Sequence, residues 1–327
     1  MTFDVRARRR ANRQLRWVGG LVASLAMAFP AAAQDEGYCG DEGVWLQILG
    51  SGGSELTDQR SAASYLVWID DTARLMVDAG SGSALRFDET GADMAGLDAI
   101  VFTRLGAATT ADLPALLEGS VDAGRKGLLP VFGPSGNDLR PAIGDFVERL
   151  IGANGAYSEL ASFLTFRNAA GYKLSVREVA ATGQRRWSRY SSDVLKLSAI
   201  PVHYGGIPAL AWRVEIGEYV IVFAGSFSNQ RDRVANFAKG ADALVVSHAA
   251  PEAARGELRE YHAIPSQLGR VAARAEARIL VLGNRTSRTL GRESQSREAI
   301  EQHFTGPLVF ANELECWGLP DKEDELP

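Results

Sequence analysis

The chain of 327 residues contains four histidines, and two of them, His203 and His262, stand where they could act chemically. Imidazole is a general acid, a general base or a metal ligand near neutral pH. His203 follows an apolar strand pattern and either lines a site or is a hydrogen-bonded structural residue. His262 precedes a predicted helix and is either an acid/base group or a residue that fills polar space there. His248 and His303 are expected to be structural or surface residues.

Hydroxyl side chains offer a second kind of chemistry. Ser226 ends an apolar strand pattern, and Thr109 lies on a glycine-containing turn. A serine and a histidine act as nucleophile and base only with hydrogen-bond geometry and an orienting group, which spacing alone does not establish. The sequence has no Gly-x-Ser-x-Gly elbow, phosphate-binding loop or Cys/His pair. Catalysis without a metal is therefore the less favoured interpretation.

The elements that must position these groups are short apolar strands punctuated by glycine. Strands come first in each half of the chain, and helices then alternate with strands. This order favours a single α/β domain of two packed sheets with outer helices over one doubly wound parallel sheet. The predicted strands are 44–49, 65–69, 75–77, 98–103, 128–132, 163–166, 174–179, 194–202, 210–216, 219–223, 243–246, 279–282 and 308–310, and the predicted helices are 112–120, 138–151, 234–239, 264–276 and 292–304.

Residues 1–33 are predicted to be a secretory signal peptide. Six arginines precede an apolar run over 17–29, and Ala31 to Ala33 provide small residues for cleavage before Gln34. The run is shorter than the ~20 residues of a spanning helix, so cleavage is favoured over an uncleaved anchor. We therefore expect a domain of residues 34–327, soluble in the periplasm or secreted, with no membrane contact.

Removal of that segment would leave a clearly acidic protein. The whole chain has 35 Lys and Arg against 40 Asp and Glu, and residues 34–327 have 29 against 39. An electronegative protein is a poor binder of phosphate backbones, so nucleic acid is not an expected partner. Arg185, Arg186 and Arg189 form a local basic group that is predicted to be a solvated loop.

Cys39 and Cys316 are the two cysteines of the chain. In an oxidising compartment an even pair favours a disulfide. Such a bond would join the ends of the mature domain, and loop-closure entropy gives it at most about 4–5 kcal/mol of stability. Two free, buried cysteines are the alternative.

Several segments, taken in order, resemble the metallo-β-lactamase superfold, in particular its RNase Z and arylsulfatase-like members. The match runs from about residue 45 to residue 312. It implies an αββα sandwich in a single domain. The segments that carry it are LQILGSGG (46–53), SYLV (64–67), LMVDAGSG (75–82), LDAIVFT (97–103), HYGGIPALAWR (203–213), VIVFAGS (220–226), GADALVV (240–246) and ILVL (279–282).

The resemblance also implies a metal site on the turn after residue 103. Members of the family have His-x-His-x-Asp-His there, and these side chains hold two divalent ions that activate a water molecule. In this chain the four positions are Arg104, Gly106, Ala108 and Thr109. Glycine and alanine have no side-chain donor atom, and arginine places a permanent cation where a metal would sit.

The distal positions of that site differ as well. His203 keeps the third histidine, but Ser226 replaces the bridging aspartate and Asn284 the last histidine. A dinuclear site of this family needs about five histidines, and the chain has four in all. His262 lies in a His-x-x-Pro segment that supplies a proton donor in RNase Z-like members.

We therefore expect a pseudoenzyme without a metal or cofactor that binds an unknown small molecule or protein in the former active-site cleft. Arg104 would recognise an anionic group. The alternatives are a zinc-dependent hydrolase of ester, phosphodiester or sulfate ester bonds with an atypical site, and an interaction protein of the cell envelope. A homodimer is compatible with the sequence. The candidate catalytic residues are His203 and His262, and the candidate ligand-binding residues are Arg104, Thr109, Ser226 and Asn284.

Overall fold

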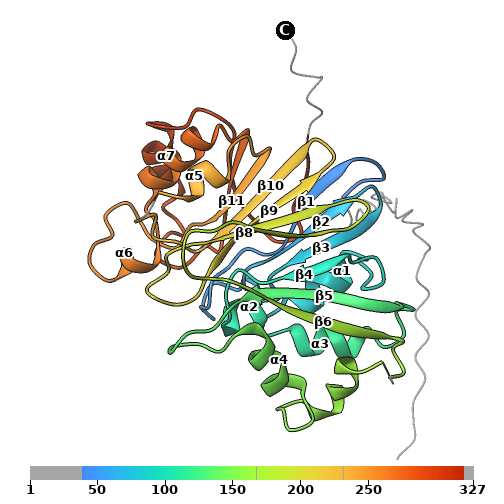
Figure 1. Cartoon of the computed structure of the whole chain (residues 1–327). Helices are drawn as coiled ribbons and strands as arrows, with labels where there is room; N and C mark the ends of the chain where they lie inside the picture. The colour runs from blue at the N-terminus through green and yellow to red at the C-terminus, as the bar shows by residue number, and fades with distance from the viewer. Residues whose placement is uncertain (1–38, 167, 231, 320–327) are drawn as a thin grey trace, which may run out of the picture. The chain divides into compact units, whose positions relative to one another are not determined.

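The computed structural model describes residues 39–319, with 167 and 231 excepted. The predicted signal peptide lies outside the described residues, so it stays a prediction, as does the domain boundary at residue 34. Residues Glu36–Pro327 form one compact unit. Its described part contains two mixed β-sheets that pack face to face, with helices on the outer sides (Figure 1).

The first sheet has seven strands in the order β14-β1-β2-β3-β4-β5-β6. β1 to β3 pair antiparallel, whereas β3 to β6 pair in parallel, each parallel step crossing over through a helix. β14 returns from the end of the chain to pair antiparallel with β1. The strands are β1 (Val44–Gly50), β2 (Ser64–Ile69), β3 (Thr72–Val77), β4 (Ala99–Val101), β5 (Gly127–Pro134), β6 (Tyr172–Val179) and β14 (Cys316–Gly318).

The second sheet repeats this plan in the order β13-β12-β11-β10-β9-β8-β7. β7 to β10 pair antiparallel, and β10 to β13 pair in parallel. The doubly wound parallel sheet is therefore wrong, because hairpins open each sheet. The strands are β7 (Trp187–Ser191), β8 (Lys196–Pro201), β9 (Leu210–Ile216), β10 (Tyr219–Gly225), β11 (Ala243–Ser247), β12 (Ile279–Gly283) and β13 (Leu308–Phe310).

Three layers of apolar side chains hold the sheets and helices together. In β2, Tyr65 and Val67 point between the sheets, and Leu66 and Trp68 point toward the outer helices, as the two-residue period of a strand requires.

Among the described residues no helix is long and apolar enough to span a membrane. The helices are α1 (Ser83–Glu89), α2 (Ala107–Thr110), α3 (Leu113–Gly119), α4 (Ile143–Ile151), α5 (Val234–Phe237), α6 (Leu258–Tyr261), α7 (Pro265–Ala275), α8 (Glu293–Glu301) and the 3₁₀ helix η1 (Ser158–Leu164).

The structure corrects two of the predicted elements. The strand expected at 163–166 is wrong, because η1 extends to Leu164 and buries Phe163 against the ring of Tyr172, with 5.1 Å between centroids. The helix expected from residue 138 begins at Ile143. Instead, the side-chain oxygen of Asn137 accepts hydrogen bonds from the backbone N–H groups of Leu139 and Arg140, which form an Asx turn.

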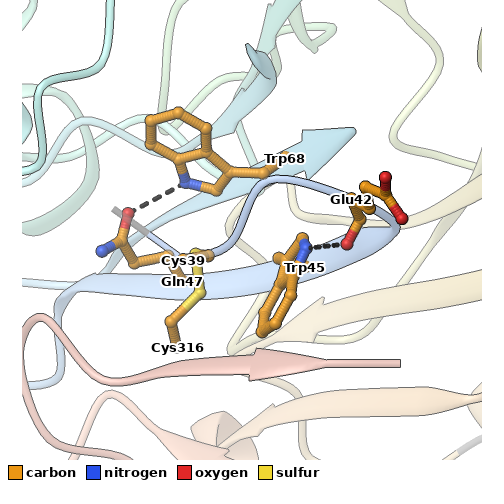
Figure 2. Close-up of a disulfide and its surroundings, with 6 residues drawn as sticks. All are labelled: Cys39, Glu42, Trp45, Gln47, Trp68 and Cys316. Atoms are coloured by element: carbon orange, nitrogen blue, oxygen red, sulfur yellow. Dashed lines mark hydrogen bonds between the residues drawn. A yellow bond between two sulfur atoms is a disulfide. The ribbon is translucent and has the colours of Figure 1, made fainter. Parts of the chain in front are cut away.

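The predicted disulfide is confirmed. Cys39 and Cys316 are bonded, with 5.5 Å between their Cα atoms. Cys316 begins β14 and lies opposite Gln47 of β1. Figure 2 shows the bond beside the buried pair in which the Trp68 indole N–H donates to the Gln47 side-chain oxygen at 2.9 Å. The bond therefore fastens the segment before β1 to the strand that completes the sheet edge.

Loss of this bond is predicted to lower stability without changing the fold. The bond closes a loop with a sequence separation of 277, so the Cys39→Ala/Cys316→Ala variant should lose about 2–5 kcal/mol of unfolding free energy. Chemical denaturation of the wild type with and without a thiol reductant measures the loss. The same reductant must leave the double variant unchanged, and equal stability of reduced and oxidised wild type would contradict the prediction.

Candidate functional site

A buried carboxyl group holds the turn that follows β4. Asp78, directly after β3, accepts the backbone N–H and the hydroxyl of Thr103, both at 2.7 Å. The carbonyl of Thr103 in turn accepts the N–H of Leu210 in β9, at 2.8 Å. The Asp-x-Gly pattern after a strand marks Asp78 in the sequence. Thr103 thus links the two sheets at the point where the candidate residues begin.

The hydroxyl of Thr109 is used within the turn itself. It donates toward the carbonyl oxygens of Arg104 and Gly106, each at 3.0 Å, and the hydroxyl of Thr110 also reaches the Gly106 carbonyl at 3.0 Å. Threonine commonly bonds such nearby backbone acceptors. Thr109 therefore closes the start of α2.

Ser226 and Asn284 meet at the ends of β10 and β12, the two strands on either side of β11 in the second sheet. The Asn284 amide donates to the Ser226 hydroxyl at 3.0 Å, and both residues are buried. With Arg104, Thr109 and Asp78 they line a small cavity whose space for the centre of a water molecule is about 10 Å³. That is about the least volume that holds one water. The structure thus brings the four expected ligand-binding positions together around a space too small for a larger ligand.

Arg104 lines this cavity, and its guanidinium packs against a group of aromatic rings. Its guanidinium carbon lies 5.3 Å from the centre of the Tyr204 ring, within the range of a cation–π contact. Tyr204 also packs edge-on against Tyr261 and His262, at 5.1 and 5.7 Å between ring centres. No hydrogen bond or ion pair involves the Arg104 guanidinium among the residues that the structure describes.

The positive charge of Arg104 affects the pKa values of two nearby buried groups, His262 and Asp78. Burial lowers the pKa of His262 to about 4, and the positive charges of Arg104 and Arg288 act in the same direction. Burial raises the pKa of Asp78 to about 7, although the hydrogen bonds from Thr103 and the charge of Arg104 oppose the rise. Arg104 is thus close enough to influence both groups.

His203 faces a different space. Its Nδ1 lies 2.8 Å from the hydroxyl of Ser228, a residue that the sequence pattern did not single out. The ring lines a wider pocket that also includes Tyr204, whereas Ser226 lines the small cavity. His203 is therefore paired with Ser228 rather than with Ser226.

The other two histidines, His248 and His303, each have a hydrogen-bond partner away from the candidate residues. His248 is fully buried, and its Nε2 lies 2.9 Å from the Ser296 hydroxyl. Burial, followed by the charge of Arg285, lowers the pKa of His248 to about 4. His303 is exposed, and its Nε2 accepts the Nε–H of Arg270 at 3.2 Å.

The donor set does not fit a zinc site. Within the described parts of the chain, no group of three or more His, Cys, Asp or Glu side chains could hold a metal ion. At the cleft the amide of Asn284 donates to Ser226, and the imidazole of His203 bonds Ser228. Ser226 and Asn284 bond each other and Thr109 bonds the backbone of its own turn, which leaves no close set of the nitrogen, sulfur or carboxylate ligands that zinc prefers among the described residues.

Known proteins match the chain by structure. No protein-family model and no curated protein matches it by sequence. The metallo-β-lactamase fold protein YhfI from Bacillus subtilis aligns with a TM-score of 0.63 and 17% identity, over 84% of this chain and 99% of that one. For the short form of human tRNase Z the values are 0.65, 17%, 85% and 100%. For zinc-bound PqqB from Methylobacterium extorquens they are 0.59, 12%, 84% and 100%. The described residues therefore have the metallo-β-lactamase fold, which confirms the expected αββα sandwich.

Replacement of Arg104 is predicted to raise the pKa of His262. The Arg104→Gln variant removes one of the cations that oppose protonation of that ring, but burial is the larger cause, so the pKa should stay below 6.5. NMR titration of the histidine ring protons measures the change. Because the folded pKa is depressed, His262 should destabilise the protein as the pH falls from about 6.5 to about 4.

His248 is the internal control for this titration, because Arg285 rather than Arg104 is the cation that acts on it. Its pKa should be the same in wild type and Arg104→Gln. If the pKa of His262 were unchanged in Arg104→Gln, or if the pKa values of His262 and His248 shifted equally, Arg104 would not lie close to the His262 ring.

Proposed function

We propose that this protein of the metallo-β-lactamase fold is a pseudoenzyme that binds the anionic group of a ligand or partner through Arg104, without a metal. The observation that carries the proposal is the half-buried Arg104 guanidinium, stacked on Tyr204 with no hydrogen bond or ion pair among the described residues. Guanidinium has five N–H donors in a planar fork that matches carboxylates and oxyanions. An arginine held in this way has its donors available to a ligand.

The surroundings of Arg104 support an anion more than a cation or a neutral group. Asp78 is the carboxyl group that Arg104 influences, and its raised pKa of about 7 leaves it only partly ionised near neutral pH. The charge of Arg104 is therefore incompletely compensated from within the protein. Contact with the Tyr204 ring and partial burial also strengthen a charge-assisted hydrogen bond relative to one in open water.

The size of the neighbouring cavity supports a contact on the outer side of Arg104. Its room of about 10 Å³ suits a single water. Ser226 and Asn284 are bonded to each other at its wall. In this proposal Arg104 and Tyr204 contact the ligand, while Thr109, Ser226 and Asn284 keep the former metal position closed.

Export to the periplasm or the exterior is part of the same proposal. Its supports are the disulfide between Cys39 and Cys316, a bond that persists mainly in oxidising compartments, and the signal peptide predicted over residues 1–33. Edman sequencing of the protein purified from an exporting host would identify the mature N-terminus.

Calorimetric titration with phosphate, sulfate and acetate tests the anion site. The wild type should bind at least one of these anions, and Arg104→Gln should weaken that binding about tenfold or more, as expected for loss of a charge-assisted bond. Arg104→Lys should retain part of it. Arg288→Gln is the matched control, because Arg288 also acts on His262 but is exposed and paired with Glu55.

Metal analysis of the purified wild type distinguishes this function from zinc-dependent hydrolysis. The proposal expects substoichiometric zinc and no loss of anion binding in a chelator. About two tightly bound zinc ions per chain, or a chelator-sensitive esterase activity that His203→Ala abolishes, would replace it with the hydrolase. Anion binding that Arg104→Gln and Arg288→Gln reduce equally would show a general charge effect and also overturn it.

A further inference from the structure

A second hollow of the molecule has the size of a ligand pocket. It opens between the loop 202–208 and residues 227–230 and 232–234, with about 310 Å³ of room, within the range of small-molecule sites. Figure 1 shows these segments after β8 and β10, at one end of the second sheet. Five apolar side chains form much of its wall: Val202, Ile207, Pro208, Phe227 and Val234.

The two charged side chains among its described lining residues already have partners within the protein. Arg233 donates to the carbonyl oxygens of Gly183, Gln184 and Pro201, at 2.7 to 3.3 Å. Asp232 forms an ion pair with Arg274. A charged ligand would have to compete with these bonds, so the pocket favours an uncharged one.

His203 gives the pocket an oriented polar group. Ser228 fixes the ring from one side through Nδ1 at 2.8 Å, and the backbone N–H of Ser228 donates to the His203 carbonyl at 2.9 Å. Ser228 is buried and does not line the pocket. Because Nδ1 is taken, Nε2 is the ring atom that remains for a ligand. Ser228 is thus a positioning residue.

Asn229 is another residue of this wall. Its side-chain oxygen is buried and has no hydrogen-bond partner among the described residues, which is uncommon for a buried amide. Its backbone has a φ of 57°, a left-handed conformation that asparagine tolerates better than most residues. This buried oxygen has too little accessible surface to bond a ligand, so His203 is the polar group on which recognition in the pocket rests.

We infer that this pocket binds the uncharged, partly apolar ring of a small molecule, with a polar substituent directed at His203. Apolar walls with a few fixed polar groups are the usual composition of such sites. The site does not require the anion contact of Arg104 and goes beyond it. A ring with an amide or hydroxyl substituent fits the pocket, whereas the matching carboxylate would have to displace the carbonyl partners of Arg233 to pair with the cation of the described lining.

Fragment binding tests this inference with benzamide, nicotinamide and p-cresol, and with benzoate as the charged counterpart. Ligand-observed NMR should detect the uncharged fragments with a Kd on the order of 1 mM, the range for so few atoms. Benzoate should bind this pocket at least several-fold more weakly. The His203 ring signals should shift on addition of the uncharged fragments.

Variants locate the binding. Ile207→Trp, on the loop that forms the pocket, should reduce fragment binding about tenfold or more. Leu85→Trp on α1, where Leu85 is 62% exposed, is the matched control and should bind like wild type. Ser228→Ala should weaken the fragments and reduce the shift of the His203 signals, while Arg104→Gln should leave fragment binding unchanged and thereby separate this site from the anion site.

Three results would overturn the inference. The first is no binding by any uncharged fragment. The second is equal binding by wild type and a folded Ile207→Trp. The third is benzoate binding that is as strong as benzamide binding and depends on Arg104, which would assign all the binding to the anion site.

Discussion

The hydrogen bonds between Asp78 and Thr103 are the interaction on which the cleft depends. A carboxyl group directly after β3 fixes Thr103, the second residue after β4, and the carbonyl of Thr103 holds β9 of the other sheet. Arg104 follows directly and forms a backbone bridge with Ala209. The position of the Arg104 guanidinium therefore depends on Asp78, a buried acid that has almost no accessible surface itself. The raised pKa of Asp78 is the cost of this arrangement, since burial penalises the charged carboxylate.

In the proposed pseudoenzyme, hydrogen bonds among neutral groups stand where the family resemblance predicts metal ligands. A metal draws several ligands together by its charge, and its removal commonly destabilises such sites. Here the Asn284 amide holds Ser226, and Thr109 holds its own turn. The hydrogen bonds of these polar side chains are therefore satisfied within the protein, around a cavity with room for about one water. In the proposals above, ligand contacts are made by Arg104, which packs on Tyr204, and by His203, which lines the wider pocket.

The sequence predicted the layers of the fold because each strand's apolar pattern depends only on local order. The alternating burial in β2 is one example. The same reasoning placed Ser226 and Asn284 at strand ends, and the structure brings them together. It did not predict β14, a strand of three residues whose partner lies almost a whole chain away. Nor did it predict that His203 bonds Ser228, because spacing fixes where a residue stands in the chain but not which rotamer its side chain adopts. The aromatic contact of Arg104 with Tyr204 was missed for the same reason.

The covalent link between Cys39 and Cys316 has a mechanical consequence. A force that pulls on the chain outside these two residues travels through the sulfur–sulfur bond and bypasses the strands between them. Without the bond, the short edge strand β14 would be the first to peel from β1, one pair of residues at a time. With the bond in place, Trp317 and Gly318 can still separate from β1, but at Cys316 the tension loads a covalent ring, and the strands inside that ring keep their geometry.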